Sequence, residues 1–400
     1  MRKSRYFGLA ALSVVAAAFV PMTTAGTSAA GVGSHTTAPI GRQLAELKGS
    51  DTVAGDFFGD SVAISGTTAV VGAVDHANDS GRVYVFTKTA AGWEQVAELE
   101  GPHAIAKDNF GWSVAISDGN VVVGAPFRAT NAGRAYVFTK TAAGWEQVAA
   151  LTGSGTVAND EFGASVAISA TNAVVGAGGH ANGSGLVHVF TDRAGQWKET
   201  AVLRGSGVVA GDELGWSVAI WGTSAAAGAE GYANDAGRVY VFTKTRRWRQ
   251  TAELKGSDTV AGDFFGDSVA VWRTTAVVGA EGCANNAGRV YVFTKTAGHW
   301  TQTAELKGSD TVAGDFFGDS VAISGKTAIV GALNHANDAG RVYVFTKTAA
   351  GWKQAAEIEG SDTVTGDWLG FSVAVSGKTA IVAAPNHAYS AGRAYVLEVR

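Results

Sequence analysis

The sequence predicts an all-β fold, a seven-bladed β-propeller with four-stranded blades. A Phe-Gly hinge or a close variant of it recurs seven times, at intervals of 51 or 52 residues. A fixed period of this size is typical of one supersecondary unit per repeat, because a single unit cannot bury its own faces. The hinge glycines are Gly59, Gly111, Gly163, Gly215, Gly266, Gly318 and Gly370.

Each repeat contains four short runs rich in β-branched and aromatic residues, separated by Gly, Asn, Asp and Ser. In the first repeat these runs are residues 61–65, 68–73, 81–88 and 93–99. The third run is apolar on both faces, so it needs cover on both sides, which stacked blades provide. The fourth run alternates polar and apolar residues, and we expect it at the outer edge of its blade.

The two ends of the chain predict how the ring closes. The fourth run begins at a tryptophan in six repeats, but the seventh repeat stops after its third run. Residues 43–47 (Gln-Leu-Ala-Glu-Leu) match residues 95–99 (Gln-Val-Ala-Glu-Leu), so the missing strand lies near the N-terminus. We expect this N-terminal strand to complete the last blade. The six tryptophans are Trp93, Trp145, Trp197, Trp248, Trp300 and Trp352.

Residues 1–30 are typical of a secretory signal peptide. Three cations (Arg2, Lys3 and Arg5) precede an apolar run over residues 7–20, and small residues follow. The apolar run is shorter than a typical transmembrane helix. We expect cleavage after Ala25 or Ala30, and a secreted or cell-surface protein; the alternative is an uncleaved N-terminal anchor.

The remaining chain is expected to form a flexible lead-in over residues 31–42 and one propeller domain over residues 43–400. Loss of the signal peptide removes three cations and no anion, which changes the formal charge from −4 to −7. An acidic chain of this kind has no electrostatic footprint for nucleic acid or an anionic membrane. We therefore expect no nucleic-acid partner, no membrane insertion and a monomer. Cys283 is the single cysteine, so no intramolecular disulfide can form.

The repeat resembles a known family. Phe110-Gly-Trp-Ser-Val-Ala115 followed by Val122-Val-Gly-Ala-Pro126 is similar to the FG-GAP repeat, the unit of the integrin α-subunit propeller and of many secreted bacterial proteins. The resemblance covers residues 43–400. The seventh repeat keeps a near form of the second motif, Ala383-Ala-Pro385, and the other five replace the proline. The replacements are Val74, Gly178, Glu230, Glu281 and Leu333.

The resemblance implies calcium, but the residues argue against it. Integrin-type repeats often hold Ca²⁺ in an aspartate-rich loop between the first two strands, and Ca²⁺ takes six to eight oxygen ligands. The corresponding segments here, such as residues 65–68, 117–120 and 324–327, read as two-residue hairpins with at most one carboxylate. We therefore expect no metal at these loops and no cofactor.

An aspartate stands three residues before every hinge glycine. The structural interpretation is that its carboxylate accepts backbone N–H groups in the turn that leads to the inner strand. The alternative, a ring of catalytic or metal-binding carboxylates, is the less favoured one. The aspartates are Asp56, Asp108, Asp160, Asp212, Asp263, Asp315 and Asp367.

A second recurring position lies in the loop between the second and third strands of each blade. With one such residue per blade, neighbours lie on the order of 10 Å or more apart, which is too far for shared tetrahedral zinc coordination. We favour a structural role with a hydrogen bond to the adjacent Asn78-type residue, and keep ligand binding at the loop face as the alternative. The residues are His76, Arg128, His180, Tyr232, Cys283, His335 and His387, of which Cys283 looks like drift rather than a nucleophile.

The residue directly after the hinge glycine varies between repeats, although its neighbours in the sequence are nearly constant. Carboxylates beside aromatic rings suit a carbohydrate or a cationic group near the mouth of the central channel. Equally, the slot could pack blade against blade, with compensating changes between neighbours. The residues are Asp60, Trp112, Ala164, Trp216, Asp267, Asp319 and Phe371.

Known enzyme motifs are missing from the sequence, which contains no Gly-x-Ser-x-Gly, His-Glu-x-x-His, P-loop or dinucleotide fingerprint. We expect a non-catalytic, adhesion-type binding protein that recognises an extracellular protein or glycan through its loop face. One alternative is a glycosidase or lyase acting on extracellular carbohydrate, with Asp267 and Asp319 as the carboxylate pair. The other is a purely structural cell-surface component.

Overall fold

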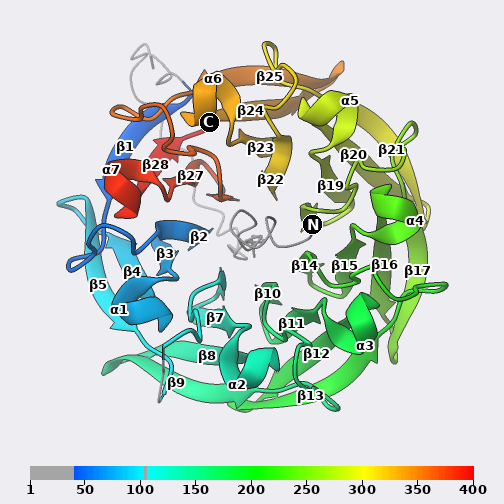
Figure 1. Cartoon of the computed structure of the whole chain (residues 1–400), viewed down its shortest axis with the longest axis horizontal. Coiled ribbons are helices and arrows are strands. Elements are labelled where there is room, and N and C mark those ends of the chain that lie inside the picture. The colour runs from blue at the N-terminus through cyan, green and yellow to red at the C-terminus, as the bar shows by residue number, and fades with distance from the viewer. Residues whose placement is uncertain (1–39, 103–105) are drawn as a thin grey trace, which may run out of the picture.

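The computed structural model describes residues 40–102 and 106–400, so the expected signal peptide and most of the lead-in lie outside the described residues. Seven four-stranded antiparallel sheets form a ring (Figure 1). This confirms the predicted seven-bladed β-propeller. None of the helices in the described ranges is long and apolar enough to cross a membrane.

Blades 1 to 6 are each built from four consecutive strands, numbered from the centre of the ring outward, and blade 7 combines three consecutive strands with β1. Blade 1 consists of β2 (Phe58–Ser65), β3 (Thr68–Ala73), β4 (Arg82–Lys88) and β5 (Trp93–Leu99), with α1 (His76–Asp79) between its second and third strands. Blade 2 has β6 (Ser113–Ser117), β7 (Asn120–Ala125), α2 (Arg128–Asn131), β8 (Arg134–Thr141) and β9 (Gly144–Leu151), and blade 3 has β10 (Val166–Ser169), β11 (Asn172–Ala177), α3 (His180–Gly183), β12 (Leu186–Arg193) and β13 (Gln196–Leu203). Blade 4 has β14 (Val218–Trp221), β15 (Ser224–Ala229), α4 (Tyr232–Asp235), β16 (Arg238–Lys244) and β17 (Trp248–Leu254), and blade 5 has β18 (Val269–Trp272), β19 (Thr275–Ala280), α5 (Cys283–Asn286), β20 (Arg289–Thr296) and β21 (His299–Leu306). Blade 6 has β22 (Phe317–Ser324), β23 (Thr327–Ala332), α6 (His335–Asp338), β24 (Arg341–Thr348) and β25 (Gly351–Ile358), and blade 7 has β26 (Val373–Ser376), β27 (Thr379–Ala384), α7 (His387–Ser390) and β28 (Arg393–Glu398).

The N-terminal strand closes the ring, as predicted. Strand β1 (Arg42–Leu47) pairs antiparallel with β28 and forms the outer edge of blade 7, with Leu47 opposite Ala394. Leu47 is only 2% exposed, so burial of its side chain fastens the strand. The first residue of β1, Arg42, adds an ion pair to Glu398 at 2.8 Å.

The burial of the strands follows their polarity patterns. The third strand, β4, buries Val83, Tyr84, Val85 and Phe86, because neighbouring blades cover both of its faces. In the outer strand β5, by contrast, half-buried and exposed residues alternate. The hinge Phe58 packs edge-on against Tyr84, with ring centroids 5.5 Å apart.

The repeated glycines are required where adjacent blades touch. The hinge Gly111 has φ 96°, in the left-handed region that favours glycine. A Cβ atom on Gly72 of blade 1 would lie 2.2 Å from the carbonyl oxygen of Gly111 in blade 2. The Ser61 hydroxyl donates to this same oxygen at 2.6 Å. Both glycines of the motif therefore serve contact between blades.

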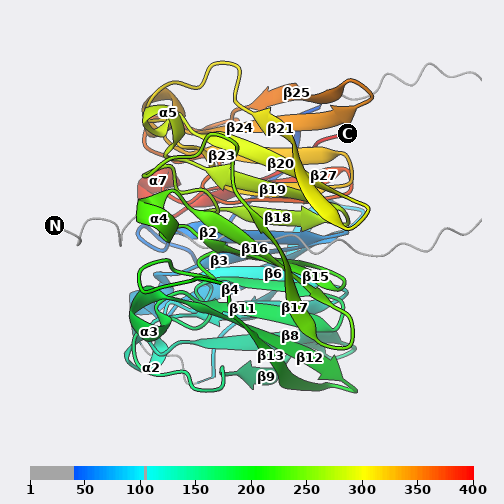
Figure 2. The same cartoon turned by 90° about the vertical axis from the view of Figure 1, so that its right-hand side faces the viewer.

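The strand order gives the ring two different faces. The short helices α1–α7 and the turns that link successive blades lie on one side, which we call the loop face; the two-residue hairpins within each blade lie on the other, the hairpin face (Figure 2).

The short helices were not predicted, and they are unusual, because Ala77 and Asn78 of α1 have φ near +55° and +60°. This left-handed turn directs the carbonyl of Asp79 to the backbone N–H of Asn109 in the next blade, at 2.9 Å.

Candidate functional site

The repeated aspartates organise the turns of the loop face. Asp56 accepts the backbone N–H of Val53 at 2.8 Å, which closes the turn before the hinge. Asp160, Asp212, Asp263, Asp315 and Asp367 make the same bond to a valine three residues earlier. Asp108 instead forms an ion pair with Arg128, and part of its turn lies outside the described residues.

The histidines of the second-to-third-strand loop bind these aspartates. His76 Nδ1 lies 2.9 Å from Asp56 Oδ2, and its Nε2 lies 3.6 Å from Asp51. The expected bond to an Asn78-type residue is therefore wrong, because the imidazole lies between two carboxylates instead. His335 and His387 likewise lie between two aspartates, whereas the ring of His180 binds Asp160.

Three blades fill the histidine slot differently, with Arg128 in blade 2, Tyr232 in blade 4 and Cys283 in blade 5. The guanidinium of Arg238 lies 4.5 Å from the ring centroid of Tyr232, a cation–π contact. Cys283 is 5% exposed, with its Sγ 3.6 Å from the Tyr291 hydroxyl. Burial raises the pKa of the Cys283 thiol to about 12, so the thiol remains protonated at neutral pH.

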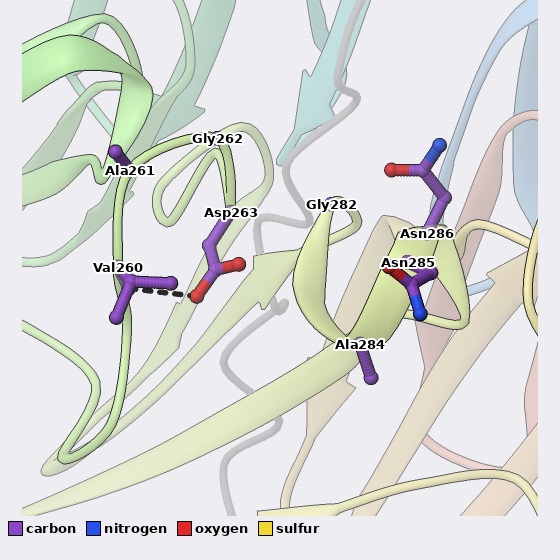
Figure 3. A pocket seen from close by; sticks show the side chains of 8 residues that line it. All are labelled: Val260, Ala261, Gly262, Asp263, Gly282, Ala284, Asn285 and Asn286. Atoms are coloured by element: carbon purple, nitrogen blue, oxygen red, sulfur yellow. Dashed lines mark hydrogen bonds between the residues drawn. The ribbon is translucent and has the colours of Figure 1, made fainter.

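The tips of the turns expose a ring of valines on the loop face. Each is between 59% and 63% exposed, although the turn beneath it is held by the buried aspartate. In blade 5 a hollow of about 550 Å³ separates the tip at Val260 from α5 (Figure 3). Its lining also includes Asp263 and Asn286, so the hollow is polar beside an apolar tip. The exposed valines are Val53, Val157, Val209, Val260, Val312 and Val364.

The variable slot after the hinge glycine lies at the inner end of each blade, and several of its residues contact a neighbour. The indole Nε1 of Trp216 donates to Asp267 Oδ1 at 2.9 Å, which links blade 4 to blade 5. Trp112 packs edge-on against Phe127, and Phe371 stacks parallel to Trp368. Asp60 is buried; burial and the nearby Asp75 raise its pKa well above the ordinary value.

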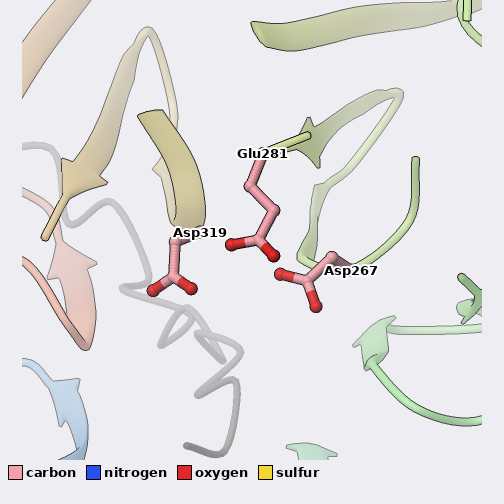
Figure 4. A group of neighbouring side chains, drawn as sticks. All are labelled: Asp267, Glu281 and Asp319. Carbon is pink, nitrogen blue, oxygen red and sulfur yellow. The ribbon is translucent and has the colours of Figure 1, made fainter. Parts of the chain in front are cut away.

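Asp267, Glu281 and Asp319 meet where blade 5 adjoins blade 6. Their carboxylate oxygens lie within 4.8 Å of one another and face a common point (Figure 4). Glu281 directly follows β19, at the position where the FG-GAP motif has proline. From the sequence, Glu281 appeared only as a departure from that motif. Its place beside two variable-slot aspartates depends on which blades are neighbours.

Further carboxylates extend this group into an acidic rim across blades 3 to 6. Burial, with Glu281 and Asp267 nearby, raises the pKa of Asp319 well above its ordinary value. Burial and Asp267 do the same for Glu230. Burial and the neighbouring Glu213 raise the pKa of Glu161 to about 6. The acidic rim consists of Glu161, Glu213, Glu230, Asp267, Glu281 and Asp319.

The acidic rim can hold shared protons or attract a positive group. Three carboxylates supply three of the six to eight oxygen ligands that Ca²⁺ takes, so a cation there would need other ligands as well. The half-buried Glu161, Glu213 and Glu281 form the accessible part of the rim, whereas Asp267 is 0% and Asp319 8% exposed. A partner would therefore meet the rim at its half-buried members.

The fold and this face define a β-propeller whose blades each present one turn and one short helix on the same side. The chain belongs to the FG-GAP repeat family: the family model matches residues 42–86, 93–138, 145–190, 197–242, 248–293, 300–345 and 352–397. A chain in the crystal structure of the mitotic checkpoint complex is similar in fold, with a TM-score of 0.59 and 13% identity over 95% of this chain and 99% of that one. At this identity the likeness concerns the fold alone. The comparison with curated proteins finds none that matches.

Proposed function

We propose that this protein is a secreted, non-catalytic binding protein of the adhesion type that recognises a protein partner through its loop face. The proposal rests on one observation, the presence of both the acidic rim and the exposed valines on the loop face. Solvent-exposed apolar tips held on ordered turns lose little conformational entropy on binding, and they suit an apolar protein surface. The rim attracts a lysine or arginine of the partner.

The alternatives in the sequence are less favoured by this geometry. A glycosidase needs both carboxylates to reach one sugar ring, but Asp267 and Asp319 are buried almost completely. A glycan partner would be expected to stack on exposed aromatic rings. Tyr389 of α7 exposes its ring on the loop face, but the variable-slot residues Trp112, Trp216 and Phe371 pack against their neighbours or bind them.

A binding screen of the full chain against arrayed extracellular proteins and glycans tests the proposal. We expect protein partners whose affinity falls at least about tenfold in a loop-face variant, Val260→Ser/Val312→Ser/Glu281→Gln. The matched control, Lys88→Gln/Lys140→Gln on the hairpin face, should bind as the parent does. Glycan partners alone, or protein binding that is indifferent to the loop-face variant, would contradict the proposal.

A further inference from the structure

The hairpin face carries its positive charge on one side of the ring. In blades 4 to 6 the hairpin segments 221–224, 244–249, 272–275, 295–300, 324–327 and 347–353 contain no aspartate or glutamate. In blades 1 to 3 the corresponding segments balance Lys88, Lys140, Arg193 and Lys198 against Glu94, Asp118, Glu146 and Asp192. The cations of blades 4 to 6 are Lys244, Arg246, Arg247, Arg249, Arg273, Lys295, Lys326, Lys347 and Lys353.

Three arginines among these cations differ in their partners from arginines at the start of the third strand on the loop face. Within the part of the chain that the structure describes, none of Arg246, Arg247 and Arg273 forms an ion pair, and all three are exposed. On the loop face, Arg289 binds Glu305 at 3.0 Å and Arg341 binds Glu357 at 2.5 Å. The charge on the hairpin face therefore remains available to a partner.

Two tryptophans interrupt a structural pattern at the same place. Five blades have a serine at the end of the innermost strand, and in four of them its hydroxyl accepts a backbone N–H of the next blade, as Ser169 does from Gly222 at 3.0 Å. Blades 4 and 5 have Trp221 and Trp272 instead, half-buried, with ring centroids 4.2 Å apart. Because five blades stack without a tryptophan here, the fold does not require this aromatic pair.

Further departures from the repeat add cations beside the pair. Arg273 follows Trp272 with φ 52°, a left-handed conformation that four other blades assign to glycine. A non-glycine residue there costs about 1 kcal/mol. The hairpin between β16 and β17 is one residue shorter than the others, and it contains Arg246 and Arg247. These changes concentrate positive charge near an aromatic surface at some cost to stability.

We propose that these residues bind an anionic polysaccharide. We call the site the hairpin patch, defined as Trp221, Trp272, Arg246, Arg247, Arg273 and Lys295. Guanidinium groups pair with carboxylate or sulfate groups through two parallel hydrogen bonds, while an indole face packs against a sugar ring. The hairpin segments of blades 4 to 6 expose no large aliphatic side chain, which disfavours insertion into a lipid surface.

A nucleic acid offers similar chemistry, because its bases stack on aromatic rings and its phosphates bind arginine. The choice of a polysaccharide rests on the export that is part of the proposed function, since polysaccharides are the abundant polyanions outside cells. The acidic formal charge of the chain also opposes the long polyanionic track of a duplex. The two partners are distinguished by direct comparison.

The experiment measures binding of the full chain to heparin, polygalacturonate, neutral dextran and a single-stranded oligonucleotide at two salt concentrations. We expect heparin and polygalacturonate to bind with an affinity that falls as salt rises. Dextran should not bind, and the oligonucleotide should bind more weakly than both polyanionic glycans. Oligonucleotide binding as tight as that of the better polysaccharide, or binding of dextran, would overturn the proposal.

The variants locate the site. Arg246→Gln/Arg247→Gln should weaken heparin binding roughly tenfold at low salt, and Lys88→Gln/Lys140→Gln, on the same face, should weaken it far less. Trp272→Ser restores the serine of five blades and should reduce the affinity for heparin further. Arg273→Gly restores the glycine of four blades and should also reduce this affinity, without risk to the fold. Equal losses in the two double variants would exclude the hairpin patch. The loop-face variant should leave heparin binding unchanged, which separates this proposal from the proposed function.

Discussion

The loop face and the hairpin face are built from the same repeat, but they differ in whether their arginines form ion pairs. On the loop face, arginines at the start of the third strand are bound by carboxylates at the end of the fourth, as Arg393 is by Glu46 at 2.7 Å. On the hairpin face of blades 4 to 6, Arg246, Arg247 and Arg273 form no such pairs among the described residues. The formal charge of −4 for the whole chain does not indicate that positive charge gathers on one face.

Positions that fill the repeat and positions that depart from it differ in their contacts. Asp56 and five of its equivalents recur because their blades use the same turn, in which each carboxylate accepts a backbone N–H three residues earlier. Trp221 and Trp272 replace the serine of five blades and Arg273 replaces the glycine of four, although those blades stack without these residues. Positions that depart from a structural slot are therefore better candidates for function than positions that fill it.

The largest expected effect concerns the closure on which both faces depend. A chain that begins at residue 49 lacks β1, whereas a chain that begins at residue 40 keeps it. We expect the first to lose cooperative thermal unfolding, because the outer edge of blade 7 and the core around Leu47 become exposed. The second should melt close to the parent. Similar melting temperatures for the two truncations, measured by circular dichroism, would contradict closure by β1.

A change at one loop-face turn should cost more stability than the loss of a lysine on the hairpin face. Asp315→Ala removes the acceptor for the Val312 N–H at 2.7 Å and for His335 at 2.9 Å. We expect a loss of about 2–4 kcal/mol in unfolding free energy, because two part-buried hydrogen bonds to the carboxylate are lost. Lys347→Ala is the hairpin-face control and should stay within about 0.5 kcal/mol. Chemical unfolding measures both, and equal losses would remove the contrast between the faces.

The acidic rim of the loop face should make the stability of the protein depend on pH. The pKa of Asp319 is raised above 3.8 in the folded protein, so the folded state binds more protons than the unfolded state above that pH. Its contribution to stability is therefore lost as pH rises from about 4 through the raised pKa. Asp319→Asn removes this loss, and we expect it to gain in melting temperature over the parent between about pH 4 and pH 8.

Glu230→Gln should act in the same direction, because burial and Asp267 raise the pKa of Glu230 as well. Melting curves recorded with a chelator present keep divalent cations from masking the effect. A constant difference between variant and parent across this pH range would show that the rim carboxylates ionise as freely in the folded protein as in the unfolded chain.

The smallest expected effect is a change in stability at Arg273 on the hairpin face. Arg273→Gly relieves a left-handed residue with φ 52°, and we expect a gain of about 0.5–1 kcal/mol. The reverse change, Gly377→Arg, is made at an equivalent site with φ 61° and open space around it, and should lose a similar amount. A loss of stability in Arg273→Gly would mean that the arginine supports the fold rather than a partner.

Much of the architecture follows from short-range features of the sequence. The period of 51 or 52 residues, the alternation within the outer strands and the match between residues 43–47 and 95–99 together predict seven blades and their closure. These features are readable because a β-strand shows which of its faces are buried within a few consecutive residues. The turn aspartates were also interpretable, since their acceptor role operates over three residues.

The sites, in contrast, depend on which blades become neighbours. Asp267 and Asp319 are a full repeat apart in the chain, and their approach to Glu281 arises only when blades 5 and 6 stack. The left-handed turns, the His76–Asp56 bond and the Trp221–Trp272 pair likewise join segments from different strands or blades. Local sequence thus specifies strands, turns and the number of repeats, because these depend on polarity and backbone preference. The acidic rim and the hairpin patch exist only in the closed ring, because burial and charge proximity are properties of residues brought together from separate repeats.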